Sequence, residues 1–398
     1  DIQRVAEQAL AEGLASARQQ RDVVDKTKFK TLNASAGSVV VIDTTDGSVV
    51  ALASNPTFDP NEFTNGIPTA TWKALNDPAN HFPLLNRVVS GQYAPGSTFK
   101  LISGIAGLRA GLITASSTID DEGKYKISDQ VFTNDGAEVN GRISLQRAIT
   151  VSSDVYFYSI GGTLWPKQRR GEAGGDIIQE TARLYGFGRA TGIDLPNEAI
   201  GRVPDAAWKQ RIHDARPDAF PYPDWLPGDN VQLAVGQGDM LATPLQLAMA
   251  YQAFAADGRL STPRLASQVV DANGKVVRAI PAEDAGRVPT PARDTMIAGF
   301  AGVVGTKGGT ATGSFASYPQ QPPAVGGKTG TAQVAGKQNT SLFVGFTPIV
   351  NPRYIVAVVA EEAGYGAETA APIARAMFEA LNGLPVAPVV ALPPAGGN

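Results

Sequence analysis

A serine followed three residues later by a lysine is the first feature of the sequence that could perform covalent chemistry. Ser97 follows a Pro-Gly pair and opens a helical pattern that includes Lys100. At this spacing both side chains lie on one face of a helix. A lysine whose pKa is lowered by its surroundings can accept the proton of a serine nucleophile. The pair alone is weak, because about one Ser-x-x-Lys is expected by chance in a chain of this length.

A second polar group heads an apolar helical run. Ser152, Ser153 and Asp154 precede Val155–Tyr158. Such a triplet is typical of a plain helix N-cap, and that interpretation stays open. As chemistry, Ser152 could relay a proton between Lys100 and a leaving group, while Asp154 could hold a lysine or the substrate.

The third group is a lysine and a threonine between glycines. Lys328, Thr329, Gly330 and Thr331 follow two glycines in a segment with strand character. Glycines let a ligand lie against the backbone, and the lysine and threonine offer a charge and a hydroxyl to a substrate carboxylate. A phosphate loop is excluded, because residue 322, where its first glycine is needed, is a proline. The similar stretch 306–310 is expected to be a turn that closes a helix.

Two pairs of β-branched runs, one near each end of the chain, predict the sheet that positions these groups. Residues 37–43 and 48–53 flank an Asp-Gly turn, which predicts a hairpin. Residues 340–346 and 354–360 flank a turn with proline and asparagine, which predicts a second hairpin. Helices are expected next to them, over 2–20 and 370–381.

One sheet assembled from both ends of the chain is therefore expected. Residues 1–60 and 320–383 would form it, and 60–320 would be a mostly helical insertion. Within the insertion the apolar spacing favours helices at 97–110, 144–158, 175–185, 244–256 and 291–304. The tail 384–398 is rich in Pro, Ala and Gly, and we expect it to be disordered.

Composition excludes several classes of function. The net charge of −3 over 398 residues gives no electrostatic footprint for nucleic acid. The chain has no cysteine, so disulfides, thiolate metal sites and a cysteine nucleophile are excluded. Its two histidines, His81 and His213, lack metal-ligand spacing. We therefore expect no metal and no cofactor, and a lysine is favoured over histidine as the base.

Together, in this order, the three groups match the signature of penicillin-binding proteins and serine β-lactamases. Over nearly its whole length the chain resembles the transpeptidase domain of class B penicillin-binding proteins, and segments 191–198 and 236–246 are also similar to that family. The resemblance implies an α/β (α+β) fold. Its five-stranded antiparallel sheet would be flanked by helices, beside an all-helical subdomain. Residues 1–383 would form this single transpeptidase domain.

The resemblance also implies the roles of the site residues. Ser97 would be the acylated nucleophile, Lys100 its base and Ser152 a further catalytic residue. Backbone N–H groups of Ser97 and Thr331 would form the oxyanion hole. Substrate binding would involve Asp154, Lys328, Thr329, Gly330 and Thr331. The substrate would be a peptidoglycan stem peptide that ends in D-Ala-D-Ala and loses its last D-Ala. An amine of a neighbouring stem would then form the cross-link, and β-lactam antibiotics would acylate the same serine.

The middle group departs from most of the superfamily, which has Asn where this chain has Asp154. A carboxylate cannot donate a hydrogen bond to a substrate carbonyl, and near Lys100 it would favour the protonated lysine. Either Lys328 takes up this charge or Asp154 has a different partner. Ser-x-Asp followed by Tyr-Phe-Tyr resembles the elongation-type penicillin-binding protein 2, some relatives of which carry zinc through a cysteine that this chain lacks.

The same resemblance implies location and partners. A membrane anchor and a pedestal domain would precede Asp1, which already lies in a helical pattern. The domain would then face the extracytoplasmic side of a bacterial membrane. Through the preceding region it would meet a RodA-like glycosyltransferase and other elongation or divisome proteins.

Alternatives remain from the sequence. A D,D-carboxypeptidase would differ only in using water in place of the amine. A β-lactam-sensing receptor domain would be acylated once and then signal. A serine β-lactamase would need a second carboxylate for deacylation, and no Glu-x-x-Leu-Asn segment lies between the second and third groups. A bifunctional enzyme with an upstream glycosyltransferase module is also possible.

Overall fold

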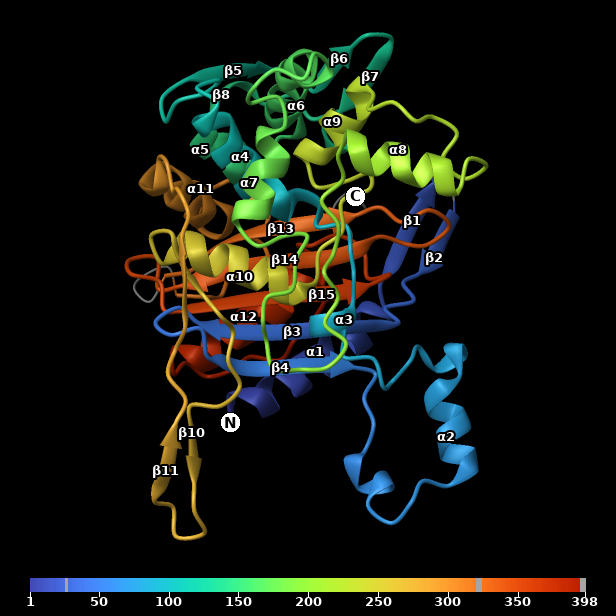
Figure 1. Cartoon of the computed structure of the whole chain (residues 1–398), viewed down its shortest axis with the longest axis vertical. Helices are drawn as coiled ribbons and strands as arrows, with labels where there is room; N and C mark the ends of the chain where they lie inside the picture. The colour runs from blue at the N-terminus through green and yellow to red at the C-terminus, as the bar shows by residue number, and fades with distance from the viewer. Residues whose placement is uncertain (26–27, 320–323, 394–398) are drawn as a thin grey trace.

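The centre of the molecule is a five-stranded antiparallel sheet built from both ends of the chain (Figure 1). The computed structural model describes residues 1–25, 28–319 and 324–393. The strand order is β13-β14-β15-β3-β4. The five strands are β3 (Ala36–Asp43), β4 (Val49–Asn55), β13 (Gly326–Ala332), β14 (Thr340–Thr347) and β15 (Tyr354–Glu361). The fold class and both terminal hairpins predicted from the sequence are confirmed.

Burial explains why these segments are strands. Every residue of β3 and of β14 is buried, as befits central strands covered on both faces. Their Val and Ile residues suit a packed, pleated surface. At the β3–β4 turn the carboxylate of Asp43 accepts from the N–H of Thr45 at 2.9 Å, and the N–H of Gly47 donates to the carbonyl of Asp43 at 3.0 Å.

Helices cover both faces of the sheet (Figure 1). On one face α1 (Ile2–Ala17) and α12 (Ala370–Leu381) pack on the sheet and on each other. On the other face lie α10 (Pro244–Ala255) and α11 (Arg293–Gly305). The start of α10 carries a capping box, in which Thr243 and Gln246 bond each other's backbone N–H groups. The buried helix α10 thereby gains a fixed N-terminus beside the strands.

A mostly helical region stands beyond the β13 edge of the sheet (Figure 1). Its main helices are α4 (Lys100–Arg109), α5 (Leu145–Val151), α6 (Asp154–Arg169), α7 (Ile177–Leu184), α8 (Ala206–Ala215) and α9 (Pro227–Ala234). Two small strand pairs belong to it: β5 (Thr118–Asp121) with β8 (Gly141–Ser144), and β6 (Lys124–Ile127) with β7 (Gln130–Thr133). Helix α6 packs on both α9 and α4.

Shorter elements complete the described chain. Strands β1 (Arg21–Asp25) and β2 (Lys28–Thr31) pair with each other, as do β9 (Arg259–Ser261) and β12 (Asp284–Arg287). The hairpin of β10 (Gln268–Val270) and β11 (Val276–Ala279) projects from the body, as does the excursion that contains α2 (Thr69–Asn76) (Figure 1). Single-turn helices are α3 (Arg87–Ser90), η1 (Pro60–Phe63), η2 (Pro78–Asn80), η3 (Gly96–Phe99) and η4 (Asp135–Ala137).

Two expectations from the sequence need correction. The helix expected over 144–158 is interrupted, because Ser152 adopts a left-handed backbone conformation (φ 58°) between α5 and α6. The tail is ordered as far as residue 393: Val389 and Ala391 are buried, and the N–H of Ala391 donates to the hydroxyl of Ser16 at 2.9 Å. Residues 394–398, and the expected subdomain boundary at 320, lie outside the described residues.

Among the residues that the structure describes, no helix has both the length and the apolar character needed to cross a membrane.

Candidate active site

The turn that carries Ser97 lies directly against the edge strand of the sheet. Ser97 is half-buried in η3, which continues into α4. The N–H of Gly96 donates to the carbonyl of Gly236 at 2.9 Å. Gly96 has φ 53°, and a Cβ placed on it would come within 2.6 Å of the carbonyl oxygen of Thr331. Only glycine therefore fits between the serine turn and β13.

Gly330 makes the same contact possible from the strand. A Cβ on Gly330 would come within 2.9 Å of the side chain of Thr98 and 3.0 Å of the carbonyl oxygen of Pro95. The third sequence group is thereby locked against the first.

The backbone of Thr331 faces away from the sheet. Its carbonyl accepts a hydrogen bond from Nε2 of Gln237 at 3.0 Å, and β13 is an edge strand. In an antiparallel strand the N–H and C=O of one residue point to the same side. The N–H of Thr331 thus points toward the serine turn, which is the orientation that an oxyanion hole requires of it.

Lys100 is fully buried, and its ammonium group makes three hydrogen bonds. Nζ donates to the carbonyl of Ser152 at 2.7 Å, to Oγ of Ser152 at 3.1 Å and to Oδ1 of Asp154 at 2.7 Å. The Lys100 side chain has 0% exposure and that of Asp154 has 20%. An ammonium has three N–H donors, so all three are directed to the second group. The sequence left open whether Lys328 or a different group pairs with the charge of Asp154. The structure pairs Asp154 with Lys100.

Lys328 contacts the same serine as Lys100 does. Its Nζ donates to Oγ of Ser152 at 2.7 Å and to the carbonyl of Thr329 at 3.1 Å. A hydroxyl oxygen has two lone pairs and one hydrogen. With both lone pairs of Ser152 directed at lysines, its own proton is left to be donated elsewhere. Such a group is suited to proton transfer.

Burial shifts the pKa of both lysines downward. For Lys100 the main cause is removal from water, and the charge of Asp154 opposes it. For Lys328 burial and the positive charge of Lys100 together hold the pKa well below its ordinary value. The two ammonium groups therefore cannot both be charged without cost, which favours a neutral amine in this site.

The second group is held by a buried polar network that the sequence did not reveal. Oδ1 of Asn134 accepts from the N–H groups of Asp154 at 2.8 Å and Val155 at 3.0 Å. Nδ2 of Asn134 donates to the fully buried carboxylate of Asp121 at 2.8 Å. Oγ of Ser153 donates to the same carboxylate at 2.6 Å and accepts from the N–H of Tyr156 at 3.0 Å. Ser153 is thus the N-cap of α6, which fixes the direction of Asp154.

Thr310 is a second residue that sequence reasoning missed. Its hydroxyl lies 2.6 Å from that of Thr329. The stretch 306–310 does close α11, as predicted, since the N–H of Thr306 bonds the carbonyl of Gly302 at 3.0 Å. No spacing in the sequence distinguishes this threonine from any other.

The structure brings together all the residues predicted for the site. Ser97, Lys100 and Ser152 come from η3, α4 and the α5–α6 break, and Asp154 opens α6. The remaining four, Lys328, Thr329, Gly330 and Thr331, lie on β13. In the described ranges no group of three or more His, Asp or Glu side chains could hold a metal ion.

The family described as "Penicillin binding protein transpeptidase domain" matches residues 37–379. A relative from Haemophilus influenzae named "Peptidoglycan D,D-transpeptidase MrdA" is 34% identical over 367 residues, which cover 86% of this chain and 52% of the relative. The chain thus spans about half the length of this curated relative.

Two solved structures are similar in fold. Pseudomonas aeruginosa PBP2 in complex with WCK 5153 has a TM-score of 0.75 at 32% identity, covering 96% of this chain and 76% of that one. The complex of PBP2 and MreC from Helicobacter pylori has a TM-score of 0.73 at 30% identity, covering 87% of this chain and 59% of that one.

Proposed function

Because the chain belongs to the penicillin-binding protein transpeptidase family, we propose that it is the catalytic part of a peptidoglycan D,D-transpeptidase with Ser97 as nucleophile. The substrate is a stem peptide ending in D-Ala-D-Ala, and β-lactams acylate the same serine. The name of the Haemophilus relative and the PBP2 structures support this proposal.

The observation that carries the proposal is the position of Ser152 Oγ between two buried lysines, 3.1 Å from Nζ of Lys100 and 2.7 Å from Nζ of Lys328. Histidine is absent from this arrangement, so proton transfer depends on lysine and serine. A neutral Lys100 has two N–H groups and one lone pair. On deprotonation it therefore gives up one of its three hydrogen bonds and gains a lone pair that can accept the proton of Ser97.

Acylation of Ser97 begins with attack on the donor peptide. Oγ of Ser97 attacks the carbonyl carbon of the penultimate D-Ala, and its proton passes to Lys100. The N–H groups of Ser97 and Thr331 stabilise the negative oxygen. The C–N bond breaks, and the leaving amine of D-Ala receives a proton through Ser152. An ester on Ser97 remains, and Lys100 is neutral again.

Transfer to the acceptor reverses these roles. The amine of a neighbouring stem attacks the ester carbonyl and loses a proton to Lys100. The C–O bond breaks, and Oγ of Ser97 recovers the proton. The product is a new amide, which is the cross-link. Lys328 and Thr329 bind the carboxylate of the donor during the first step, and Thr310 orients the hydroxyl of Thr329.

The location and partners follow from this function. A transpeptidase that acts on peptidoglycan works on the extracytoplasmic side of the bacterial membrane, held there by a preceding anchor. The MreC complex of the Helicobacter relative supports assembly with elongation proteins. The elongation-type second group, Ser152 to Asp154, favours a RodA-like polymerase as a further partner.

The test is covalent labelling by a fluorescent penicillin. Ser97→Ala should abolish labelling without changing the circular dichroism spectrum. Ser267→Ala changes an exposed serine just before the projecting hairpin of β10 and β11, and it should label like the parent chain. Labelling of Ser97→Ala at the parental level would refute the assignment.

A second measurement separates transfer from hydrolysis. The acyl-enzyme formed from a D-Ala-D-Ala thioester should react with an added amine and give an amide product. Hydrolysis alone would indicate a carboxypeptidase instead.

A further inference from the structure

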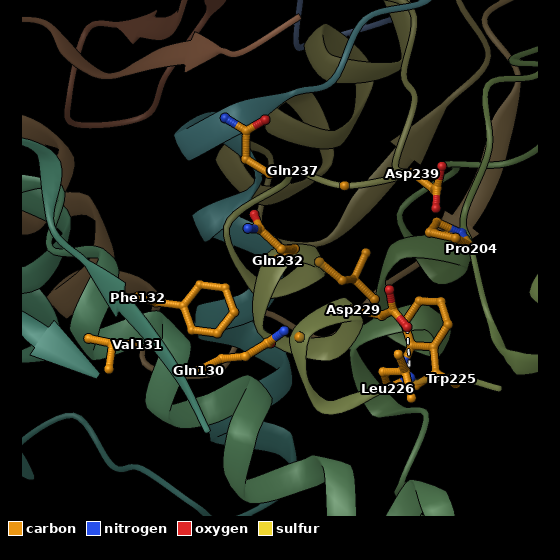
Figure 2. Close-up of a pocket in the computed structure, with 13 residues that line it drawn as sticks. Gln130, Val131, Phe132, Pro204, Trp225, Leu226, Asp229, Gln232, Gln237 and Asp239 are labelled. Carbon is orange, nitrogen blue, oxygen red and sulfur yellow. Dashed lines mark hydrogen bonds between the residues drawn. The ribbon is translucent and has the colours of Figure 1, made fainter. Parts of the chain in front are cut away.

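A cavity of about 500 Å³ lies in the helical region beside the candidate site (Figure 2). Its walls come from β7, from α9 and from the loop 237–239, with Trp225 and Leu226 before α9. None of the residues predicted for the site lines it. Figure 2 shows the labelled side chains around this space, with Gln237 at one end and Gln130 at the other.

The loop 236–239 connects the cavity to the site. Gly236 accepts from the N–H of Gly96, one residue before Ser97, and Gln237 donates to the carbonyl of Thr331. The next two residues, Gly238 and Asp239, line the cavity together with Gln237. One loop therefore both lines the cavity and contacts the backbone next to the oxyanion-hole N–H groups proposed for Ser97 and Thr331.

The direction of β13 indicates which part of a substrate reaches this cavity. If the terminal carboxylate binds at Lys328 and Thr329 and the reacting carbonyl at the N–H of Thr331, the donor peptide follows β13. Its C-terminus then lies at Lys328, and its preceding residues lie at Thr331 and beyond. A residue's carbonyl lies further along the strand than its N–H, and residues advance by about 3.3 Å each. Gln237, bonded to the Thr331 carbonyl, thus lies beside the donor residue upstream of the reacting D-Ala.

The lining suits a side chain with an apolar stem and a polar end. Phe132, Trp225 and Leu233 supply an apolar wall. The amides of Gln130 and Gln232 have no hydrogen-bond partner within residues 1–25, 28–319 and 324–393, so both are free to bond a peptide group. Pockets of this kind orient a ligand by a few polar groups on an apolar surface.

Two carboxylates reach the cavity, and Asp239 is the one without a hydrogen-bonded cation in the described part of the chain. Asp229 is ion-paired with Lys209 and also accepts from the N–H of Leu226 at 2.7 Å. The carboxylate of Asp239 has Arg202 as its cation, at 3.9 Å, and accepts no hydrogen bond in the described part of the chain.

Arg202 is too far from the carboxylate of Asp239 to donate a hydrogen bond to it. Its Nε donates to the backbone carbonyl of Asp239 at 2.6 Å, and its guanidinium lies 4.7 Å from the ring centre of Trp208. Partial burial raises the pKa of Asp239, so a second cation beside it would stabilise the ionised form.

We propose that this cavity binds the amine-bearing side chain of the donor stem peptide, one residue upstream of the acylated D-Ala, with its ammonium at Asp239 and its stem on the apolar wall. This inference rests on the proposed function. Donor and acceptor stems are alike, so the donor carries the same kind of amine that the acceptor uses in the cross-link. The acceptor is the other possible source of this chemistry, and the experiment separates the two.

The experiment compares two donor peptides with the parent chain and its variants. Nα-acetyl-Lys-D-Ala-D-Ala has a free ε-amine, and the Nα,Nε-diacetyl peptide lacks its charge. We expect the parent to release D-Ala from the free-amine peptide with a kcat/KM about tenfold higher, which corresponds to one charge-assisted contact. Asp239→Asn should remove this preference and leave kcat/KM for the diacetyl peptide unchanged. Asp224→Asn, an equal charge change outside the lining, should keep it.

The possible results are distinct. Equal preference in the parent and in Asp239→Asn overturns the proposal. An effect of Asp239→Asn only on the yield with an added amine acceptor, at unchanged donor kcat/KM, also overturns it and assigns the cavity to the acceptor. If the parent neither labels with penicillin nor releases D-Ala, the proposed function itself has failed. Labelling and D-Ala release without any amine preference would defeat the cavity proposal alone.

Discussion

Nζ of Lys100 lies 2.7 Å from Oδ1 of Asp154, so the negative charge of the second group is paired with the lysine proposed as base. The pair is largely buried, and an opposite charge at this distance favours the protonated lysine. Removal from water has the opposite and larger effect, and the pKa of Lys100 is lowered. The charge of Asp154 therefore keeps the pKa of Lys100 higher than burial alone would make it.

Asp154→Asn should move the acid limb of acylation to lower pH. The substitution removes the charge that stabilises protonated Lys100, so the pKa of Lys100 falls further and more of it is neutral at a given pH. A shift of about one pH unit is expected for loss of a close opposite charge. The measurement is the pH profile of the rate of penicillin acylation. Asp120→Asn, an exposed carboxylate on β5, serves as the control. An acid limb that stays in place or rises would show that Lys100 is not the proton acceptor.

Ser152→Ala and Ser152→Gly should separate the hydroxyl from the backbone conformation. Both lose the group between the two lysines, and the acylation rate should fall about 10²- to 10³-fold, as for loss of an acid–base group. Because Ser152 has φ 58°, glycine relieves a conformation that alanine keeps, and the Gly variant should be the more thermostable of the two. Thermal unfolding and penicillin labelling measure the two effects. Parental labelling by either variant would remove Ser152 from the proton path.

The three groups could be predicted because each is local in the sequence. Ser97 and Lys100 share one helical turn, and Lys328 to Thr331 share one strand. Asn134 and Thr310 could not be predicted as supporting partners, since they come from distant segments and are ordinary polar residues in the sequence. Gln237 lies in segment 236–246, which resembles the family, but its hydrogen bond to Thr331 depends on the fold. The choice between Lys100 and Lys328 as the partner of Asp154 also depends on packing between α4, α6 and β13.

The secondary structure was predicted only where the sequence carries a local signal for it. The sheet followed from β-branched runs and an Asp-Gly turn, and helix 370–381 was predicted with its observed bounds. The break at Ser152 carries no glycine or proline signal, because a left-handed serine is held by its surroundings. The tail composition favoured disorder, yet burial of Val389 and Ala391 against the rest of the molecule overrides composition up to residue 393.

Asn134→Ala should destabilise the fold and displace the second group. It removes the acceptor for the N–H groups of Asp154 and Val155 and one donor to buried Asp121. Leaving two N–H groups at the start of α6 without their acceptor, and a buried carboxylate short of a donor, costs about 2–3 kcal/mol. Urea unfolding should show this loss together with slower penicillin acylation. Asn140→Ala removes a single donor to Asp121 and should cost less. Equal losses for the two variants would contradict the role of Asn134 as the acceptor for the first two N–H groups of α6.

Lys328→Met should stabilise the folded chain while it impairs acylation. Burial lowers the pKa of Lys328, so between that lowered pKa and the ordinary value of 10.5 the unfolded chain binds more protons than the folded one. The stability of the parent therefore rises with pH across this window, and methionine removes the burden of the buried charge. At pH 7 the gain in free energy of unfolding should be about 1–2 kcal/mol. Lys337→Met, an exposed lysine, should give no gain.

The pH dependence is the decisive part of this prediction. The stability difference between Lys328→Met and the parent should shrink as the pH rises toward 10, because Lys328 is then neutral in the folded parent and increasingly neutral in the unfolded chain. Urea unfolding at pH 7 and pH 9.5 measures the difference. A gain that is equal at both pH values would come from packing alone, and a loss at pH 7 would show that the hydrogen bonds of Lys328 to Ser152 and Thr329 outweigh its desolvation.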